Sequence, residues 1–365
     1  MQLLDASFGQ YLFDLFFYLI LCFISWRLVG KRDRLTFVWL LIVAFCVLSF
    51  FAGDWFHYRS QLPYIDKSFS EPLYYYFAIL SFRNYFLFRF LVWGCATLLF
   101  FYISKVNDLD QSSLLFVFIL LFLPTFCYAR ASLAMSSYFL GLSLWANMRQ
   151  KHFKVSIFIT GSFFIVLSFF FHRSFLPIIA LSPLVFFKFN RGFIVLLIIL
   201  IPLFMRALSM VLNLAAEDSL IDGEEFEAFS ATAQGYANQT RHVFNWKFTL
   251  ISNLKHIGLY IPFIYILFRT KFSKHRVRLP RYLEKIFIVD FFIYLLATVF
   301  FLLSISQDSS DVLGYRFLYM TGIPTTVLMA YLLQKHELTK VKAFLLFFCT
   351  WLSTVGLILG KLLSL

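Results

Sequence analysis

Three arginines stand in short segments between apolar runs, where together they could bind a polyanion. Arg130 lies in Tyr-Ala-Arg-Ala-Ser, Arg173 in Phe-His-Arg-Ser-Phe and Arg316 in Gly-Tyr-Arg-Phe. A guanidinium is a planar fork of N–H donors that matches the oxygens of a phosphate or a carboxylate. One such arginine could equally snorkel to a lipid phosphate. Three of them, in tight turns at the same depth, favour a shared anion-binding site over three unrelated lipid contacts.

Two carboxylates in the segment 53–84 could act as a general acid or base. Asp54 follows an apolar run, so we expect its side chain to be partly desolvated. Glu71 precedes Pro72, and proline is typical of the first turn of a helix. Each also has a purely structural interpretation, since Asp54 could pair with Arg59 and Glu71 could stabilise a helix N-terminus. The sequence leaves both interpretations open.

Aromatic residues accompany these charges. The stretch 73–82 is aromatic and too short to span a membrane, which predicts an interfacial or re-entrant helix. Aromatic faces suit sugar rings, although a membrane belt is the commoner explanation. The candidates for contacting a sugar, which rank behind the charged groups above, are Tyr58, Tyr74, Tyr315, Arg206 and Arg241.

The chain lacks the familiar motifs of metal and nucleotide sites. It contains no H-E-x-x-H, no C-x-x-C and no G-x-x-x-x-G-K. No two histidines have a metal-ligand spacing within one predicted helix. Asp108-Leu109-Asp110 matches D-x-D, but it falls in a short loop predicted to lie inside, where we expect a solvated turn. We therefore predict a site without metal or cofactor.

The elements that must position these residues are membrane helices. Residues of the set AVILMFWYC make up 61% of the 365-residue chain and charged residues 14%, with a mean hydropathy of +0.80. A soluble protein needs about a quarter of its residues charged, so a cytosolic enzyme, a secreted disulfide scaffold and a disordered chain are excluded. The apolar residues suffice for about ten to twelve spans of about 20 residues. The net charge of +13 fits cationic cytoplasmic loops better than nucleic-acid binding.

We predict an all-α polytopic integral membrane protein with about twelve transmembrane helices, forming a single transmembrane domain over residues 1–365. Apolar runs between polar breaks give the spans. They are Phe8–Trp26, Leu35–Ala52, Tyr85–Ser104, Leu114–Tyr128, Ser132–Asn147, Val155–Phe171, Phe175–Phe187, Phe193–Met210, Phe248–Phe268, Ile286–Ser304, Phe317–Leu333 and Ala343–Gly360.

Basic residues in the loops set the orientation. With both termini outside, the loops predicted to lie inside contain most of the lysines and arginines, and most acidic residues fall outside. Two long segments, 53–84 and 211–247, are then outer loops. The second contains the acidic run Glu217–Glu227, which is either a solvated loop or a lid over a polar substrate.

The order of these motifs resembles that of the EpsG-like branch of the Wzy-type polysaccharide polymerases. The likeness rests on four motifs and covers essentially the whole chain in length, span number and motif order. The motifs are the loop from Asp54 to Glu71-Pro72-Leu73-Tyr74, then Arg130-Ala131-Ser132-Leu133-Ala134, His172-Arg173-Ser174 and Tyr315-Arg316-Phe317.

Proteins of that family join oligosaccharide repeat units carried on undecaprenyl diphosphate into O-antigen or exopolysaccharide, at the outer face of the bacterial inner membrane. The resemblance implies this glycosyltransferase activity here, with an active site facing the periplasmic side. It also implies a chain-length regulator protein as a partner and is compatible with a GT-C-like glycosyltransferase architecture.

The resemblance also gives the candidate residues their roles. Arg130, Arg173 and Arg316 would bind the diphosphate leaving group and neutralise it without a metal. The attacking sugar hydroxyl needs a general base, for which Asp54 and Glu71 are the first candidates. His172 is an alternative base, or a group that orients the diphosphate. Direct displacement would invert the anomeric carbon.

Two other classes of membrane protein have similar size and span number. A lipid-linked oligosaccharide flippase or polysaccharide transporter should have charges near the bilayer midplane on several helices. Here Asp14, Arg89 and Asp290 are the main charges inside apolar runs. A membrane acyltransferase that modifies polysaccharide would need a His-acid centre open to a cytoplasmic acyl donor, whereas His57 and His172 are predicted outside. Both classes remain alternatives.

Overall fold

The structure is a computed structural model that describes residues 8–30, 59–65, 72–121, 123, 129–148, 154–187, 190–203, 206, 246–307 and 312–363. All regular structure in these residues is helical, which confirms the predicted all-α class. The chain divides into two compact units. Unit 1 is Met1–Phe187, Ile251–Val289 and Gly322–Leu365, and unit 2 is Lys188–Leu250 and Asp290–Thr321. That both belong to a single transmembrane domain stays a prediction.

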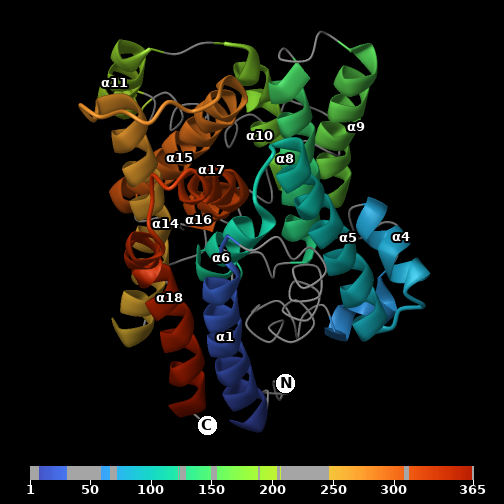
Figure 1. Ribbon diagram of the computed structural model, residues 1–365. Helices are drawn as coiled ribbons and strands as arrows, with labels where there is room; N and C mark the ends of the chain where they lie inside the picture. Colours follow the sequence, from blue (N-terminus) through green and yellow to red (C-terminus); the bar gives the residue numbers. More distant parts are fainter. Residues whose placement is uncertain are drawn as a thin grey trace. The chain divides into compact units, whose positions relative to one another are not determined.

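The helices are named as in Figure 1. Their bounds are α1 Phe8–Leu28, η2 Leu62–Tyr64, α4 Pro72–Leu80, α5 Tyr85–Val106, α6 Gln111–Leu121, α8 Ala129–Met148, α9 Val155–Phe171, η3 Arg173–Phe175, α10 Leu176–Leu181, η4 Ser182–Phe186, α11 Arg191–Ile199, α14 Trp246–Leu267, η5 Phe268–Phe272, α15 Arg281–Gln307, α16 Val312–Met320, α17 Gly322–Gln334 and α18 Lys340–Leu363.

Five stretches of the described residues are long and apolar enough to cross a membrane, judged by length and composition. They are Tyr11–Leu28, Tyr85–Val106, Arg281–Leu302, Gly314–Gln334 and Lys340–Gly360. The polytopic membrane class is therefore supported, while the number of twelve spans and the GT-C-like architecture stay predictions. The predicted span Leu35–Ala52 lies outside the described residues.

Prolines interrupt two of the predicted spans. The run 175–187 is not one helix but η3, α10 and η4, because Pro177 and Pro183 each lie in the first turn of a new helix, where a missing N–H is tolerated. The run 317–333 breaks at Thr321, and Pro324 follows in the first turn of α17. Apolar content alone does not show such breaks.

In unit 1, α8 packs in antiparallel fashion along α9 and also packs along α5 (Figure 1). A Cβ atom added at Gly141 of α8 would lie 2.5 Å from the carbonyl oxygen of Gly161 on α9, so the two backbones touch there. Next to this crossing, the ring of Trp145 on α8 stacks on that of Phe158 on α9, with 5.3 Å between the ring centroids. The close approach requires glycine at this position of α8.

The loops predicted to lie inside meet at one end of unit 1. Asp110 caps α6, because its Oδ2 accepts a hydrogen bond from the backbone N–H of Ser113 at 3.2 Å and from the hydroxyls of Ser112 and Ser113 at 2.8 and 2.7 Å. Its own N–H donates to the side-chain oxygen of Gln334 at 3.0 Å. The D-x-D match is therefore a helix cap. The Tyr282 hydroxyl donates to the carbonyl of Asn107 at 3.0 Å, and Arg269 pairs with Glu337 at 3.2 Å. Within unit 1 these loops share one side as predicted, and the assignment of that side to the cytoplasm stays a prediction.

The first and last helices lie side by side within unit 1 (Figure 1). Lys340, at the start of α18, donates to the carbonyls of Trp26 and Val29 at the end of α1, at 3.3 and 3.4 Å. The two helices are therefore antiparallel. Further along α18, the Thr350 hydroxyl donates to the Leu120 carbonyl of α6 at 3.1 Å, which fixes α18 on a third helix.

Unit 2 contains α11, the second part of α15 and α16. A Cβ added at Gly314 of α16 would lie 2.8 Å from the ring of Phe301 on α15. The rings of Phe301 and Tyr315 meet edge to face at 4.8 Å, and Phe300 stacks on Phe317 at 5.2 Å. Aromatic packing thus holds α16 against α15.

Candidate functional site

The helix α4 joins α5 to the end of α9 through aromatic contacts. Tyr74 meets Phe88 of α5 at 5.0 Å between ring centroids, and Phe77 meets Phe171 of α9 at 6.0 Å. Phe171 is the last residue of α9, and His172 follows it. The start of α5, the helix α4 and the end of α9 therefore form one end of this helix cluster in unit 1. The sequence predicts that this end is the outer one.

At this end, His172 and Arg173 form the junction between α9 and η3. His172 has an extended backbone, with φ −158° and ψ 109°, and its N–H donates to the Ser168 carbonyl at 3.0 Å. Its ring is half-buried and lies 6.4 Å from that of Phe175, which is fully buried. Arg173 is exposed. A half-buried imidazole and an exposed guanidinium therefore follow each other in the chain at this end of unit 1.

The antiparallel pairing of α8 with α9 brings the backbone of Arg130 to the same end. The Ser137 hydroxyl of α8 donates to the Phe164 carbonyl of α9 at 2.8 Å. Continuing this register by two helical turns pairs Arg130 with Phe171. Arg130 is the second residue of α8, so it lies inside a helical turn and not in the loop that the sequence predicts. Of the three predicted diphosphate ligands, Arg130 and Arg173 thus stand at one end of unit 1.

The other described candidates belong to unit 2. Arg316 is inside α16, and both it and Tyr315 are half-buried. Tyr315 packs its ring against Phe301. Arg206 is exposed. That Arg316 meets Arg130 and Arg173 in one site stays a prediction.

Four candidates, Asp54, Tyr58, Glu71 and Arg241, lie outside the described residues, as do the segment 207–245 and the proposed lid within it. Their roles stay predictions. Two features of the segment 53–84 are nevertheless visible. The helix α4 begins at Pro72, as the proline predicts, and Arg83 donates to the carbonyls of Pro63 and Ile65 at 2.5 and 3.4 Å. Arg83 therefore holds residues 59–65 against the turn between α4 and α5.

Comparison with known protein families gives one match. The model of the EpsG family matches residues 10–361, nearly the whole chain. The chain belongs to the EpsG family. No curated protein and no solved structure matches it. EpsG membership supports a role in polysaccharide polymerisation, with a lipid-linked saccharide as substrate in the membrane.

In this EpsG family chain, the aromatic candidates in α4 differ in exposure. Tyr74 is 7% exposed and its ring is covered by Phe88, whereas Tyr76 is exposed. Sugar binding by Tyr74 stays a prediction, and the structure adds Tyr76 as the ring on α4 with an open face. Both are in the aromatic stretch that the sequence identifies.

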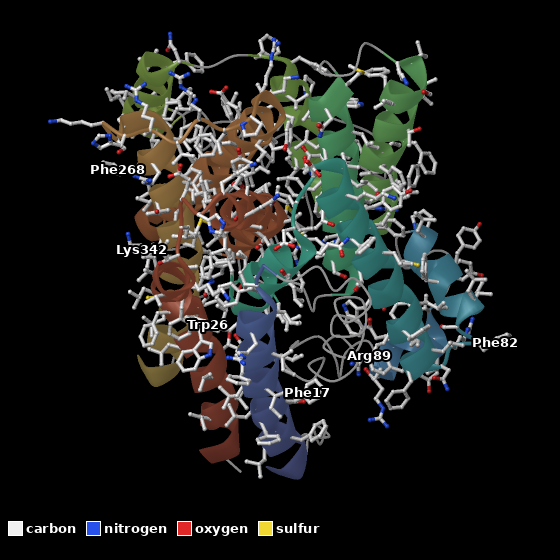
Figure 2. The ribbon with its side chains drawn as sticks, viewed as in Figure 1. Phe17, Trp26, Phe82, Arg89, Phe268 and Lys342 are labelled. Atoms are coloured by element: carbon white, nitrogen blue, oxygen red, sulfur yellow. The ribbon has the colours of Figure 1, made fainter. Side chains whose placement is uncertain are left out.

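Sequence reasoning did not include Arg89 in the site of this EpsG protein. Arg89, labelled in Figure 2, is in the second turn of α5 and only 4% exposed. Its guanidinium carbon lies 4.8 Å from the ring centroid of Trp93 and 5.6 Å from that of Tyr85, which is the geometry of cation–π contacts. Because Arg89 follows Phe88, which touches Tyr74 of α4, it adds a cation to the same end of unit 1. The sequence could have identified Arg89 as a candidate, because a charged residue inside an apolar run is often functional.

Proposed function

We propose that this EpsG family protein is a polysaccharide polymerase that joins oligosaccharide repeat units carried on undecaprenyl diphosphate. It works in the bacterial inner membrane as a glycosyltransferase, with its active site on the periplasmic side. One observation supports this most directly. Arg130 and the pair His172–Arg173 stand together at the end of the antiparallel pair α8 and α9, away from the loops that gather at the other end of unit 1.

The reaction needs a leaving group neutralised at headgroup depth. The bond between the anomeric carbon of the growing chain and its lipid diphosphate breaks, and a bond to a hydroxyl of the incoming unit forms. Undecaprenyl diphosphate leaves, and the hydroxyl proton passes to a base. Arg130 and Arg173, joined by Arg316, bind the diphosphate through forked N–H donors, so no metal is required.

The base is one of three groups. Asp54 and Glu71 are the carboxylates nearest the membrane in the first outer segment, and His172 is the described group next to an arginine. A base must lie within hydrogen-bond reach of the proton that it takes. A single displacement inverts the anomeric carbon, so linkage analysis that found the same anomer in substrate and polymer would exclude this mechanism.

Polymerisation can be tested with purified protein. Lipid-linked repeat units are extracted from source cells lacking this protein. With purified protein, in the presence of EDTA and without nucleotide, they should be joined into chains of increasing length, which a gel separates as a ladder of bands. A flippase would move the same lipid across vesicles without a ladder, and an acyltransferase would need an acyl donor. A chain-length regulator, the partner that we propose, should narrow the ladder without being needed for it.

Replacement of arginine by lysine tests the diphosphate site. Arg130→Lys and Arg173→Lys keep the charge but lose the two-point contact, so each should lower the rate of polymerisation at least about tenfold. Arg278→Lys is the matched control, because Arg278 is exposed in the loop after η5, among the loops at the other end of unit 1. Normal ladders from both site variants would show that these arginines do not bind the diphosphate.

A further inference from the structure

A line of polar groups runs along α5 from the proposed site into the bilayer region. Arg89, Trp93 and Thr97 follow each other at intervals of four residues, so their side chains leave neighbouring positions on one face of the helix. All three are buried, with exposed fractions of 4%, 3% and 2%. They cover about 12 Å along the helix axis.

The packing of α5 on α8 adds Ser136 to this line. Asn107, at the end of α5, donates to the hydroxyl of Ser143 on α8 at 3.0 Å. Arg89 precedes Asn107 by five full helical turns, and Ser136 precedes Ser143 by two, so both lie on the faces through which the helices meet. Because α5 and α8 run in parallel, Ser136 stands within about one turn of the level of Thr97. We call Arg89, Trp93, Thr97 and Ser136 the polar stripe.

Three polar atoms of the stripe are buried without a hydrogen-bond partner among the described residues. They are Trp93 Nε1, Thr97 Oγ1 and Ser136 Oγ. Burial of a polar group without a partner is unfavourable by about 1–3 kcal/mol, and in a membrane no bulk water compensates for it. Such groups in a native protein need an explanation, and a bound polar ligand supplies one.

Three groups of the same kinds elsewhere in the described part of unit 1 are satisfied. The Ser137 hydroxyl, next to Ser136, donates to Phe164, and the Thr326 hydroxyl donates to the carbonyl of Gly322 at 2.6 Å. The indole N–H of Trp145 donates to the carbonyl of Phe158 at 3.2 Å. Thr97 has the carbonyl of Trp93 one turn before it in the same helix but does not use it. The stripe therefore departs from the pattern of the surrounding bundle.

We propose that Trp93, Thr97 and Ser136 hydrogen-bond the saccharide of the lipid-linked substrate, with Arg89 at the end of the stripe nearest the diphosphate. An indole donor and two hydroxyls that both donate and accept match the hydroxyl groups of a sugar, whereas a phosphate would need further cations. This inference rests on the proposed function, because it assigns the saccharide to the same site. It makes the stripe part of what selects the substrate.

The test removes each polar atom, and each control makes the same substitution at a satisfied residue elsewhere in unit 1. The variants are Trp93→Phe, Thr97→Val and Ser136→Ala, and the matched controls are Trp145→Phe, Thr326→Val and Ser137→Ala, whose polar atoms are satisfied. Binding to protein in nanodiscs is measured for two probes, bare undecaprenyl diphosphate and the same lipid carrying the repeat unit from cells lacking this protein.

Each stripe variant should bind the sugar-bearing lipid about fivefold more weakly, as expected for the loss of one hydrogen bond, and the triple variant on the order of a hundredfold. Affinity for bare undecaprenyl diphosphate should not change. Thr97→Val and Ser136→Ala should unfold at the same or a higher temperature, since an unsatisfied group is removed, and Thr326→Val and Ser137→Ala at a lower temperature. Trp93→Phe and Trp145→Phe both lose buried ring volume, so their unfolding temperatures are compared only with each other. If the stripe had a purely structural role, a variant that binds the sugar-bearing lipid more weakly would also unfold at a lower temperature.

The outcomes separate the two proposals. If the triple variant binds the sugar-bearing lipid as the wild type does, or loses bare lipid equally, the saccharide assignment is overturned. If the wild type binds the sugar-bearing lipid and forms no ladder, the proposed function fails while the binding result still decides the stripe. Lipids carrying one unit or several show whether the stripe holds the acceptor or the growing donor chain.

Discussion

Gly141→Ala is the sharpest test of how α8 and α9 hold the proposed site together. The new methyl group would lie 2.5 Å from the Gly161 carbonyl oxygen and 3.0 Å from the backbone N of Ile165, whereas ordinary contacts begin at 3.4 Å. The Ile165 side chain, whose Cγ1 would be 2.8 Å away, can turn aside, but these two backbone atoms cannot. The helices must separate by about 0.9 Å, the difference between 3.4 and 2.5 Å. Overpacking of this kind is unfavourable by about 1–3 kcal/mol.

Two measurements follow from that displacement. A loss of about 2 kcal/mol should lower the unfolding temperature in detergent by roughly 5 °C. The ends of α8 and α9 position Arg130 and His172, and a shift of about 1 Å in a reacting geometry can lower a rate by up to about a hundredfold. Polymerisation should therefore fall further than stability alone explains when it is measured well below the unfolding temperature.

Gly94→Ala is the matched control, because nothing lies within 4 Å of its added Cβ on α5. It should leave the unfolding temperature unchanged or raise it slightly, since alanine is the better helix former. If Gly141→Ala unfolds at the same temperature as Gly94→Ala and polymerises normally, the close crossing of α8 and α9 is wrong, and with it the placement of Arg130 beside His172.

Three further variants and one control test helix contacts within each unit by thermal unfolding. Asp110→Ala removes the cap of α6 and should lower stability by about 1 kcal/mol. Gly258→Ala places a methyl 2.6 Å from the backbone N of Thr350 and should be destabilising by about 1–3 kcal/mol, whereas Gly360→Ala, with nothing within 4 Å, should be neutral. The three atoms nearest to an added Cβ at Gly314 belong to the Phe301 ring, from 2.8 Å, and a ring can shift, so Gly314→Ala should be less destabilising than Gly141→Ala. Equal effects at Gly141 and Gly314 would contradict the distinction between backbone and side-chain neighbours.

Helix positions were predictable where polar residues bound an apolar run. The predicted span Val155–Phe171 coincides with α9, because Lys154 and His172 end the run on both sides. The run 317–333 was predicted as one helix, but the backbone breaks at Thr321 because of the proline that follows. Hydropathy measures the free energy of transferring side chains into the membrane. It does not register the single backbone N–H that a proline lacks.

The candidate site was predictable only in part, because charge is visible in a sequence and hydrogen-bond partnership is not. Arg173 stood out as a cation between apolar runs, and the structure places it after His172, at the same end of unit 1 as the backbone of Arg130. Thr97 and Ser136 are ordinary residues of an apolar helix when read from the sequence. Their interest comes from the absence of a partner among the described residues, which depends on how α5 packs on α8.

The pairing of α1 with α18 has a consequence for biosynthesis. The ribosome makes α1 long before α18, yet Lys340 at the start of α18 contacts the carbonyls at the end of α1. The side of nascent α1 that packs on α18 therefore stays uncovered until α18 has been made. A truncated chain that lacks α18 would leave this side of α1 uncovered for good.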